Sequence, residues 1–280
     1  MTDLTRLDGP NSLDGPISLD GLNNLDGRAA LITGASRGIG FAIATELLSR
    51  GASVTITARK PDELAAAAES LVSGAAGGDA DRVLAVAANV GSPESREASV
   101  TQTVGRFGRL DILINNAGIN PTYGFLMDAD LAAVSKTFDT NVVAPLAYVQ
   151  LAYRAWMAEH GGAVVNIASV AGLRSTGVIP AYGASKAALI RLTEELAWQL
   201  GPSVRVNAVA PAVVKTTFAT ALYAEGEEKV SAAYPMKRLG EPADIAHVVG
   251  FLVSDAAGWM TGETIRVDGG ILATGTLGSA

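Results

Sequence analysis

Short runs of apolar residues alternate with longer helical patterns along the chain from residue 28 onward. Most of these runs are apolar at every position rather than at every second one, which is typical of parallel strands buried on both faces. They predict seven strands, at residues 29–33, 53–58, 82–88, 111–115, 163–169, 204–210 and 264–269. Parallel strands that alternate with helices are joined by right-handed crossovers, so the pattern predicts an α/β fold with a doubly wound parallel sheet and helices on both faces.

The helical segments carry their own start and stop signals. Residues 40–51 end at a glycine, whereas residues 61–74 begin with proline and two acidic residues and also end at a glycine. No linker and no second apolar core interrupts residues 28–270, so we expect a single domain. In sheets of this kind, ligands bind beyond the carboxyl ends of the strands.

Composition excludes several classes of function. The chain has 280 residues and a net charge of -7, which disfavours nucleic acid as a partner. It has no cysteine, and its two histidines, His160 and His247, are far apart, so we expect no metal site. No apolar run approaches the ~18 residues that a membrane helix needs, and the N-terminus does not have the pattern of a signal peptide. We therefore expect a cytoplasmic protein with no membrane partner.

The first strand leads directly into the sequence TGASRGIG, whose glycines are Gly34, Gly38 and Gly40. Glycines at a strand-to-helix turn let the backbone approach a pyrophosphate, which then faces the free N–H groups of the helix N-terminus. The turn therefore predicts a Rossmann-type dinucleotide site. Its expected contacts are Gly34, Ser36, Arg37, Gly38, Ile39 and Gly40.

The end of the second strand indicates which dinucleotide is bound. A carboxylate there would bind the ribose 2′-hydroxyl of NAD, but this strand ends in Ala58, followed by Arg59 and Lys60. Together with Arg37, these cations favour a 2′-phosphate, so we expect NADP(H) to be preferred over NAD(H). If Arg37 and Arg59 are only solvated loop charges, this preference has no basis.

A second constellation sets Ser169, Tyr182 and Lys186 in order, with Tyr182 and Lys186 four residues apart. On a helix that spacing puts both side chains on one face. A nearby ammonium would lower the pKa of the Tyr182 phenol from about 10 toward neutrality, as a proton donor to a carbonyl oxygen requires. A lone Tyr-x-x-x-Lys pair also arises by chance, so the pair depends on its context.

That context makes the chain resemble the short-chain dehydrogenase/reductase family over about residues 26–270. The resemblance rests on TGASRGIG, on NNAG at 115–118, on TNVVAP around Asn141, on the Ser, Tyr and Lys set, and on VDGG at 267–270, all in the family's order. It implies hydride transfer between a nicotinamide and a carbonyl or alcohol carbon.

The resemblance also implies roles for individual residues. Tyr182 is the general acid or base, Ser169 orients the carbonyl oxygen, Lys186 binds the nicotinamide ribose, and Asn141 anchors a water. Further cofactor contacts are implied at Asn89, Val90, Asn116, Ala117, Gly118, Pro211, Val214 and Thr216, in addition to Tyr182 and Lys186.

Two positions depart from the family pattern. Asn89 stands where many members have aspartate, and its amide can still bond an adenine amino group. Ala212 follows Pro211 where glycine is usual, and its Cβ disfavours a positive φ and adds bulk near the nicotinamide.

By the same resemblance, three loops choose the substrate. Their large side chains are mostly apolar and suit an apolar ketone or secondary alcohol: Tyr123, Phe125, Leu173, Val178, Phe218 and Leu222. We expect the long segment 212–238 to be a lid that orders on binding.

The chain looks most like NADP-dependent carbonyl reductases, with 3-oxoacyl-carrier-protein reductases close behind. The latter activity would need a basic surface for an acidic carrier, and Lys215, Lys237 and Arg238 are opposed there by acidic neighbours. A hypothesis from another class of function is a regulatory protein that binds the cofactor without turnover.

The N-terminus repeats Leu-Asp-Gly four times at a period of six. Only the last copy, at 25–27, matches the stretch that precedes the first strand in this family. We therefore predict a low-complexity tail at 1–24 and a catalytic domain at 25–280. Family members of this kind often form tetramers, so a homotetramer or homodimer is implied.

Overall fold

The computed structural model describes residues 19–74, 79–224 and 226–273. Within them, seven parallel strands form one sheet in the order β3-β2-β1-β4-β5-β6-β7. The strands are β1 (Ala29–Thr33), β2 (Ser53–Ala58), β3 (Val83–Ala87), β4 (Ile112–Asn115), β5 (Gly162–Ile167), β6 (Val204–Pro211) and β7 (Thr264–Val267). All seven predicted strands are confirmed, and their bounds lie within two residues of those expected.

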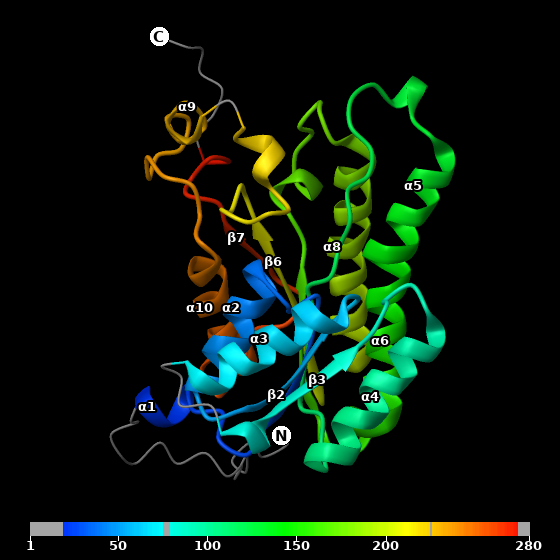
Figure 1. Ribbon diagram of the computed structural model, residues 1–280, viewed down its shortest axis with the longest axis vertical. Coiled ribbons are helices and arrows are strands. Elements are labelled where there is room, and N and C mark those ends of the chain that lie inside the picture. The colour runs from blue at the N-terminus through cyan, green and yellow to red at the C-terminus, as the bar shows by residue number, and fades with distance from the viewer. Residues whose placement is uncertain (1–18, 75–78, 225, 274–280) are drawn as a thin grey trace, which may run out of the picture.

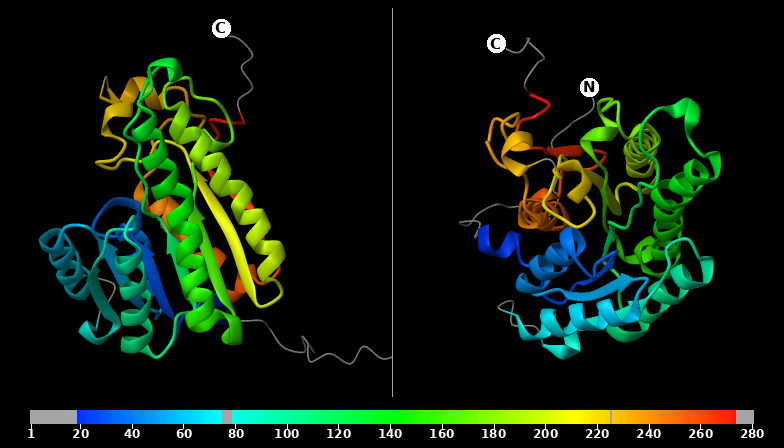
Figure 2. Two further views of the ribbon diagram at one scale, coloured as in Figure 1. Left: turned by 90° about the vertical axis from the view of Figure 1, so that its right-hand side faces the viewer. Right: turned by 45° about the horizontal axis from the view of Figure 1, so that its top comes forward.

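Helices cover both faces of this sheet, as predicted (Figure 1; Figure 2). The first face carries α2 (Gly38–Ser49), α3 (Pro61–Ser73) and α10 (Pro242–Val253), and the second carries α4 (Pro93–Phe107), α6 (Ala144–Ala152) and α8 (Pro180–Leu200). Successive strand residues face opposite layers: Ile32 belongs to the core under α2, whereas Leu31 belongs to the core under α8. This is why the strands are apolar at every position.

Shorter elements connect these layers. The remaining α-helices are α1 (Leu19–Leu22), α5 (Leu131–Phe138), α7 (Ala158–His160) and α9 (Glu227–Ser231). Two π-helical turns are η3 (Asp139–Val143) and η4 (Tyr153–Met157). The 3-10 turns are η1 (Ala80–Arg82), η2 (Leu126–Asp128), η5 (Val170–Gly172), η6 (Thr220–Leu222) and η7 (Asp255–Ala257).

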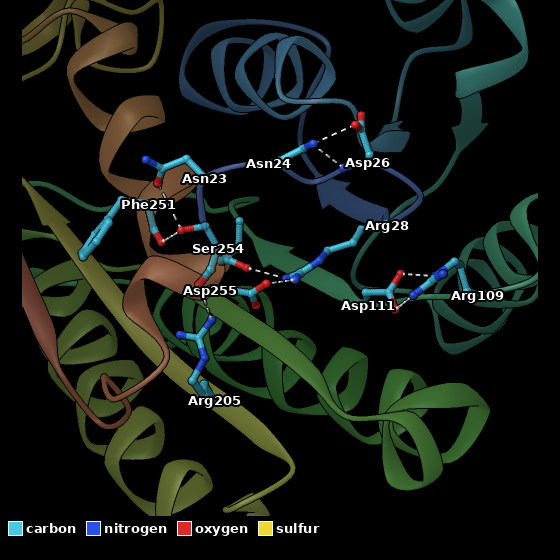
Figure 3. A network of polar contacts seen from close by, with 11 residues as sticks. Asn23, Asn24, Asp26, Arg28, Arg109, Asp111, Arg205, Phe251, Ser254 and Asp255 are labelled. Carbon is cyan, nitrogen blue, oxygen red and sulfur yellow. Dashed lines mark hydrogen bonds and ion pairs between the residues drawn. The ribbon is translucent and has the colours of Figure 1, made fainter. Parts of the chain in front are cut away.

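A polar network holds the amino ends of the strands together (Figure 3). Arg28 forms an ion pair of 2.6 Å with Asp255 and donates to the carbonyl of Val253. Arg205 donates to the carbonyls of Leu252 and Ser254 at 2.7 and 3.1 Å. These arginines therefore satisfy the last carbonyls of α10, where the negative end of the helix dipole lies. The network is at the edge opposite the expected ligand site and serves the fold.

The last Leu-Asp-Gly copy packs on the sheet domain, because Leu25 is fully buried in the core. The Leu25 amide donates to the carbonyl of Arg50 at 2.8 Å. Gly51 has φ +97°, and a Cβ there would lie 1.8 Å from the Asp26 carboxylate, so the turn requires glycine. Of the predicted tail, residues 1–18 lie outside the described residues, whereas α1 packs against η7. Within 19–74, 79–224 and 226–273, no helix has the length and apolar character needed to cross a membrane.

Candidate active site

The glycine turn lies between β1 and α2, at the carboxyl edge of the sheet. Gly34 and Gly38 have φ of +66° and +59°, a region that residues with a Cβ rarely adopt. A Cβ on Gly40 would lie 2.5 Å from Asn116 Nδ2 and 2.6 Å from the Gly34 carbonyl oxygen. The N-cap of α2 is Arg37, whose side chain has no acceptor atom and so leaves the first-turn amides without a side-chain cap. This cradle fits a pyrophosphate.

Asn116 and Thr33 tie the end of β4 to the glycine turn. The Asn116 side-chain amide donates to the carbonyls of Thr33 and Gly34 at 2.8 and 2.9 Å. In return, the Thr33 hydroxyl accepts from the amides of Asn116 and Ala117, both at 3.0 Å. Asn116 and Ala117 therefore lie beside the glycine turn. The Asn116 side chain holds the backbone of that turn in place.

The catalytic candidates converge from three elements. Tyr182 and Lys186 lie on one face of α8 and are both buried, with Lys186 Nζ 5.6 Å from the centre of the Tyr182 ring. Ser169 follows β5, and its hydroxyl accepts from the amide of Ala171 at 3.1 Å. Lys186 Nζ donates to the carbonyl of Ile167 at 2.7 Å. The structure thus brings the predicted set together at the carboxyl edge.

Asn141 lies in η3, a π-helical turn of the kind often found at functional sites. Its side-chain amide donates to the Ile119 carbonyl and to the Ser185 hydroxyl, both at 3.0 Å, and its oxygen accepts from the Ile119 amide at 2.9 Å. Asn141 therefore locks the loop after β4 against α8. Gly118 lies beside it, where a Cβ would come within 3.3 Å of Asn141 Oδ1. That Asn141 anchors a water stays a prediction.

The remaining cofactor candidates line the same edge. Ser36 is half-buried, and Ile39 packs on the core under α2. Beyond β3, Asn89 is exposed and accepts from the Gly91 amide at 3.1 Å, while Val90 is half-buried. At the end of β6, Pro211 and Val214 are buried and Thr216 lies under Gly38.

Ala212 does not strain the backbone. Within the described ranges, the one non-glycine residue with a positive φ is Lys237, so Ala212 has a conformation that any residue adopts. Its amide donates to the Val267 carbonyl at 3.3 Å.

The loop after β4 lies against the loop before α8, because the Gly124 amide donates to the Val178 carbonyl at 2.8 Å. Phe218 faces the site from the segment after β6, with its ring centre 6.1 Å from that of Tyr182. All six predicted substrate residues are exposed large side chains: Tyr123, Phe125, Leu173, Val178, Phe218 and Leu222. Within the described residues, no group of three or more His, Asp or Glu side chains is placed to hold a metal ion.

Comparisons with known proteins agree with this geometry. The sequence model of a family described as "Enoyl-(Acyl carrier protein) reductase" matches residues 34–272. The human protein named "Dehydrogenase/reductase SDR family member 4" is 38% identical over 246 residues, which is 87% of this chain and 87% of that protein. This chain belongs to the short-chain dehydrogenase/reductase family.

Other members give the same picture. "Tropinone reductase-like 3" of Erythroxylum coca is 36% identical over 245 residues, 87% of this chain and 92% of that protein. A short-chain type dehydrogenase/reductase from Mycobacterium marinum has a TM-score of 0.85 at 32% identity, covering 92% of this chain and 100% of that one. A blue fluorescent protein from a metagenomic library, solved in complex with NADPH, has a TM-score of 0.79 at 33% identity, covering 89% and 99%.

One electrostatic expectation for this short-chain dehydrogenase/reductase was wrong. Burial raises the pKa of Tyr182 to about 12; the neighbouring Ser169 hydroxyl lowers it in part, and Tyr123 raises it. Burial also lowers the pKa of Lys186 to about 8. Because both groups are enclosed, loss of hydration outweighs the attraction that an exposed pair would gain, and the phenol is not brought toward neutrality.

Several positioning residues of this member of the family were missed from sequence. Ser185 accepts from Asn141 and donates to the Tyr182 carbonyl at 2.7 Å. The buried amide of Asn166 accepts from Asn115 on β4 and donates to Thr193 on α8, both at 2.9 Å. Ser185 could have been suspected from its place beside Lys186, whereas the Asn115–Asn166–Thr193 chain joins residues distant in sequence.

Proposed function

We propose that this short-chain dehydrogenase/reductase transfers hydride between NADP(H) and the carbonyl or alcohol carbon of an apolar ketone or secondary alcohol. The observation that carries the proposal is the convergence of Ser169, Tyr182 and Lys186 beside the glycine turn. A protein that bound the cofactor without turnover would not need this set.

Each residue has a distinct task in the proposed reaction. When bound, the nicotinamide supplies or accepts the hydride. The Ser169 hydroxyl holds the substrate oxygen, and the Tyr182 phenol donates its proton to that oxygen during reduction. A pKa of about 12 keeps the phenol protonated at neutral pH, which suits the reductive direction. Lys186 binds the ribose and adds positive charge behind the ring.

Three features support NADP(H) as the preferred cofactor. β2 ends at Ala58 rather than at an acid, and Arg37 and Lys60 flank that end. A relative with 33% identity was solved with NADPH. Cations beside an acid-free strand end favour a phosphate over a ribose hydroxyl.

Replacing Ala58 with aspartate should move the preference toward NADH. The new carboxylate would repel the 2′-phosphate, so we expect kcat/KM with NADPH to fall by about 10- to 100-fold, while NADH improves. Ala58→Asn, which adds similar bulk without charge, should change the NADPH/NADH ratio far less. An unchanged ratio in Ala58→Asp would contradict the assignment.

The apolar substrate walls support a ketone without charged groups, because Tyr123, Phe125 and Phe218 offer it hydrocarbon surface. A panel of ketones, secondary alcohols and β-ketoacyl thioesters, assayed with NADP(H) and NAD(H) side by side, tests this directly. We expect turnover of apolar ketones with NADPH. Absence of turnover across the whole panel would instead support a binding protein.

The second candidate, a 3-oxoacyl-carrier-protein reductase, is favoured by the carrier protein in the matched family's description. However, Lys215 forms ion pairs with Glu227 and Glu241, and Arg238 forms one with Asp244. These cations are already neutralised and offer little to an acidic carrier. Selective turnover of the thioesters would reverse the ranking.

Other parts of the proposal concern assembly. Trp198 on α8 is 87% exposed and Trp259, before β7, is fully exposed, which supports a homotetramer or homodimer through these elements. We also propose that residues 212–238 form a lid over the substrate and that residues 1–24 form a low-complexity tail. A cytoplasmic location stays a prediction.

A further inference from the structure

Glu63 lies in the first turn of α3 and bonds two of the cations assigned to the cofactor. Its Oε1 accepts from Lys60 Nζ at 2.5 Å, and its Oε2 accepts from Arg37 Nη1 at 3.2 Å. Arg37 belongs to the glycine turn after β1, whereas Lys60 follows β2. One carboxylate therefore joins the two segments that border the proposed 2′-phosphate position, where α3 packs beside α2 (Figure 1).

The three cations near the end of β2 differ in whether an acidic side chain pairs with them. Glu63 uses both oxygens on Arg37 and Lys60, while within the described ranges the Arg59 side chain has no bonding partner. The hydrogen bond from Lys60 is the main reason that the pKa of Glu63 is below its ordinary value, so the carboxylate is ionised at neutral pH. The side chains of Arg37 and Lys60 are 61% and 70% exposed, so a phosphate can reach both.

We propose that Glu63 is a specificity-determining residue that competes with the 2′-phosphate for Arg37 and Lys60. This inference rests on the proposed preference for NADP(H). Two anions need the same donors, so a bound phosphate must displace or share the carboxylate, which also repels it. NADH has only a hydroxyl at this position, so it neither competes with Glu63 for the two cations nor is repelled by the carboxylate. Glu63 thereby limits how strongly the enzyme discriminates between the two dinucleotides.

The chain offers a matched control in Asp62, the preceding residue in the same helical turn. Asp62 is exposed and has no side-chain partner within the described residues. Glu63→Gln and Asp62→Asn each remove one negative charge near the N-terminus of α3, so both lose the same favourable interaction with the helix dipole. Only Glu63→Gln releases Arg37 and Lys60.

Calorimetric binding of NADPH, NADH, adenosine 2′,5′-bisphosphate and adenosine 5′-monophosphate tests the proposal without turnover. We expect Glu63→Gln to bind NADPH and the bisphosphate about three- to tenfold more tightly than wild type, in keeping with two exposed ion pairs. NADH and the monophosphate should change by less than about twofold, and Asp62→Asn should behave like wild type. The gain should shrink in high salt, because screening weakens exposed charge interactions.

Two results would overturn the proposal. If Glu63→Gln binds NADPH no more tightly than Asp62→Asn does, Glu63 does not compete with the phosphate. If it weakens NADH binding selectively, Glu63 binds the ribose hydroxyl instead. The proposed function fails separately, when the wild-type protein itself binds NADH more tightly than NADPH.

Discussion

Replacing Tyr182 with phenylalanine is expected to lower kcat for ketone reduction by about 10²- to 10⁴-fold, the usual contribution of a positioned proton donor. The change removes only the phenol oxygen from a buried ring, so the fold should keep its stability to within about 1 kcal/mol. NADPH affinity, measured by fluorescence, should fall far less than kcat does, because Tyr182 is only one of many expected cofactor contacts. A loss of activity that follows loss of cofactor binding would contradict the role of proton donor.

Tyr148 provides the matched control for this substitution. It is also a buried tyrosine, lies 3.2 Å from the Ser99 hydroxyl, and has a pKa raised by burial. It packs in the core on α6, away from the catalytic set. Tyr148→Phe should therefore leave kcat near the wild-type value. Equal losses in both variants would show a general effect of removing a buried hydroxyl.

Replacing Lys186 with methionine is expected to separate activity from stability. We expect kcat/KM to fall by about 10²-fold or more, because losing one preorganised donor at a reacting centre typically costs about 2.7–4 kcal/mol, or about 10²- to 10³-fold. At pH 7, however, the variant should be at least as stable as wild type, since it no longer buries an ammonium whose pKa is lowered to about 8. Loss of the bond to the Ile167 carbonyl offsets about 1 kcal/mol of this gain.

The pH dependence of stability tests the same prediction. In the unfolded chain Lys186 keeps its proton up to about pH 10.5, whereas in the folded protein it loses it from about pH 8. The unfolded state thus binds more protons in this window, and wild-type stability rises with pH there. Lowering the pKa of Lys186 from 10.5 to about 8 corresponds to about 3 kcal/mol of unfolding free energy. The stability advantage of Lys186→Met should shrink by this amount between pH 8 and pH 10.5.

Urea unfolding of wild type and Lys186→Met at a series of pH values measures the difference in their free energies of unfolding. Groups that titrate equally in both proteins do not contribute to this difference. A variant that is much less stable than wild type at pH 7, or a gap that does not narrow with pH, would show that the ammonium is not desolvated. Greater stability combined with lost activity would identify Lys186 as a charge retained for function.

The apolar runs predicted the strands of the sheet well, because each run is a pattern of residues adjacent in sequence. A strand buried on both faces must be apolar at successive positions, and β1 and β2 have the predicted bounds. The glycine turn was equally local: Gly34 and Gly38 need a positive φ that their own lack of a Cβ permits. Strand ends were less certain, as at β5, where pairing with neighbouring strands decides the last residue.

The sequence predicted that the proposed catalytic residues lie close together, but it did not predict the electrostatics around them. The spacing of Tyr182 and Lys186 on a helix places them on one face whatever surrounds them. It cannot show that both are enclosed, and enclosure reversed the expected direction of the Tyr182 pKa. In the same way, the sequence shows three cations near the end of β2 but not that Glu63 already bonds two of them.

For this protein, the sequence alone determined the order of strands and helices along the chain and the glycine turn, and it placed the proposed catalytic residues on their elements, because these depend on local pattern and spacing. Only the tertiary structure decided which polar groups meet across the sheet, as Asn115, Asn166 and Thr193 do, and how far burial removes water from Tyr182 and Lys186. Desolvation and long-range hydrogen bonds depend on everything packed around a group, and no short stretch of sequence contains that information.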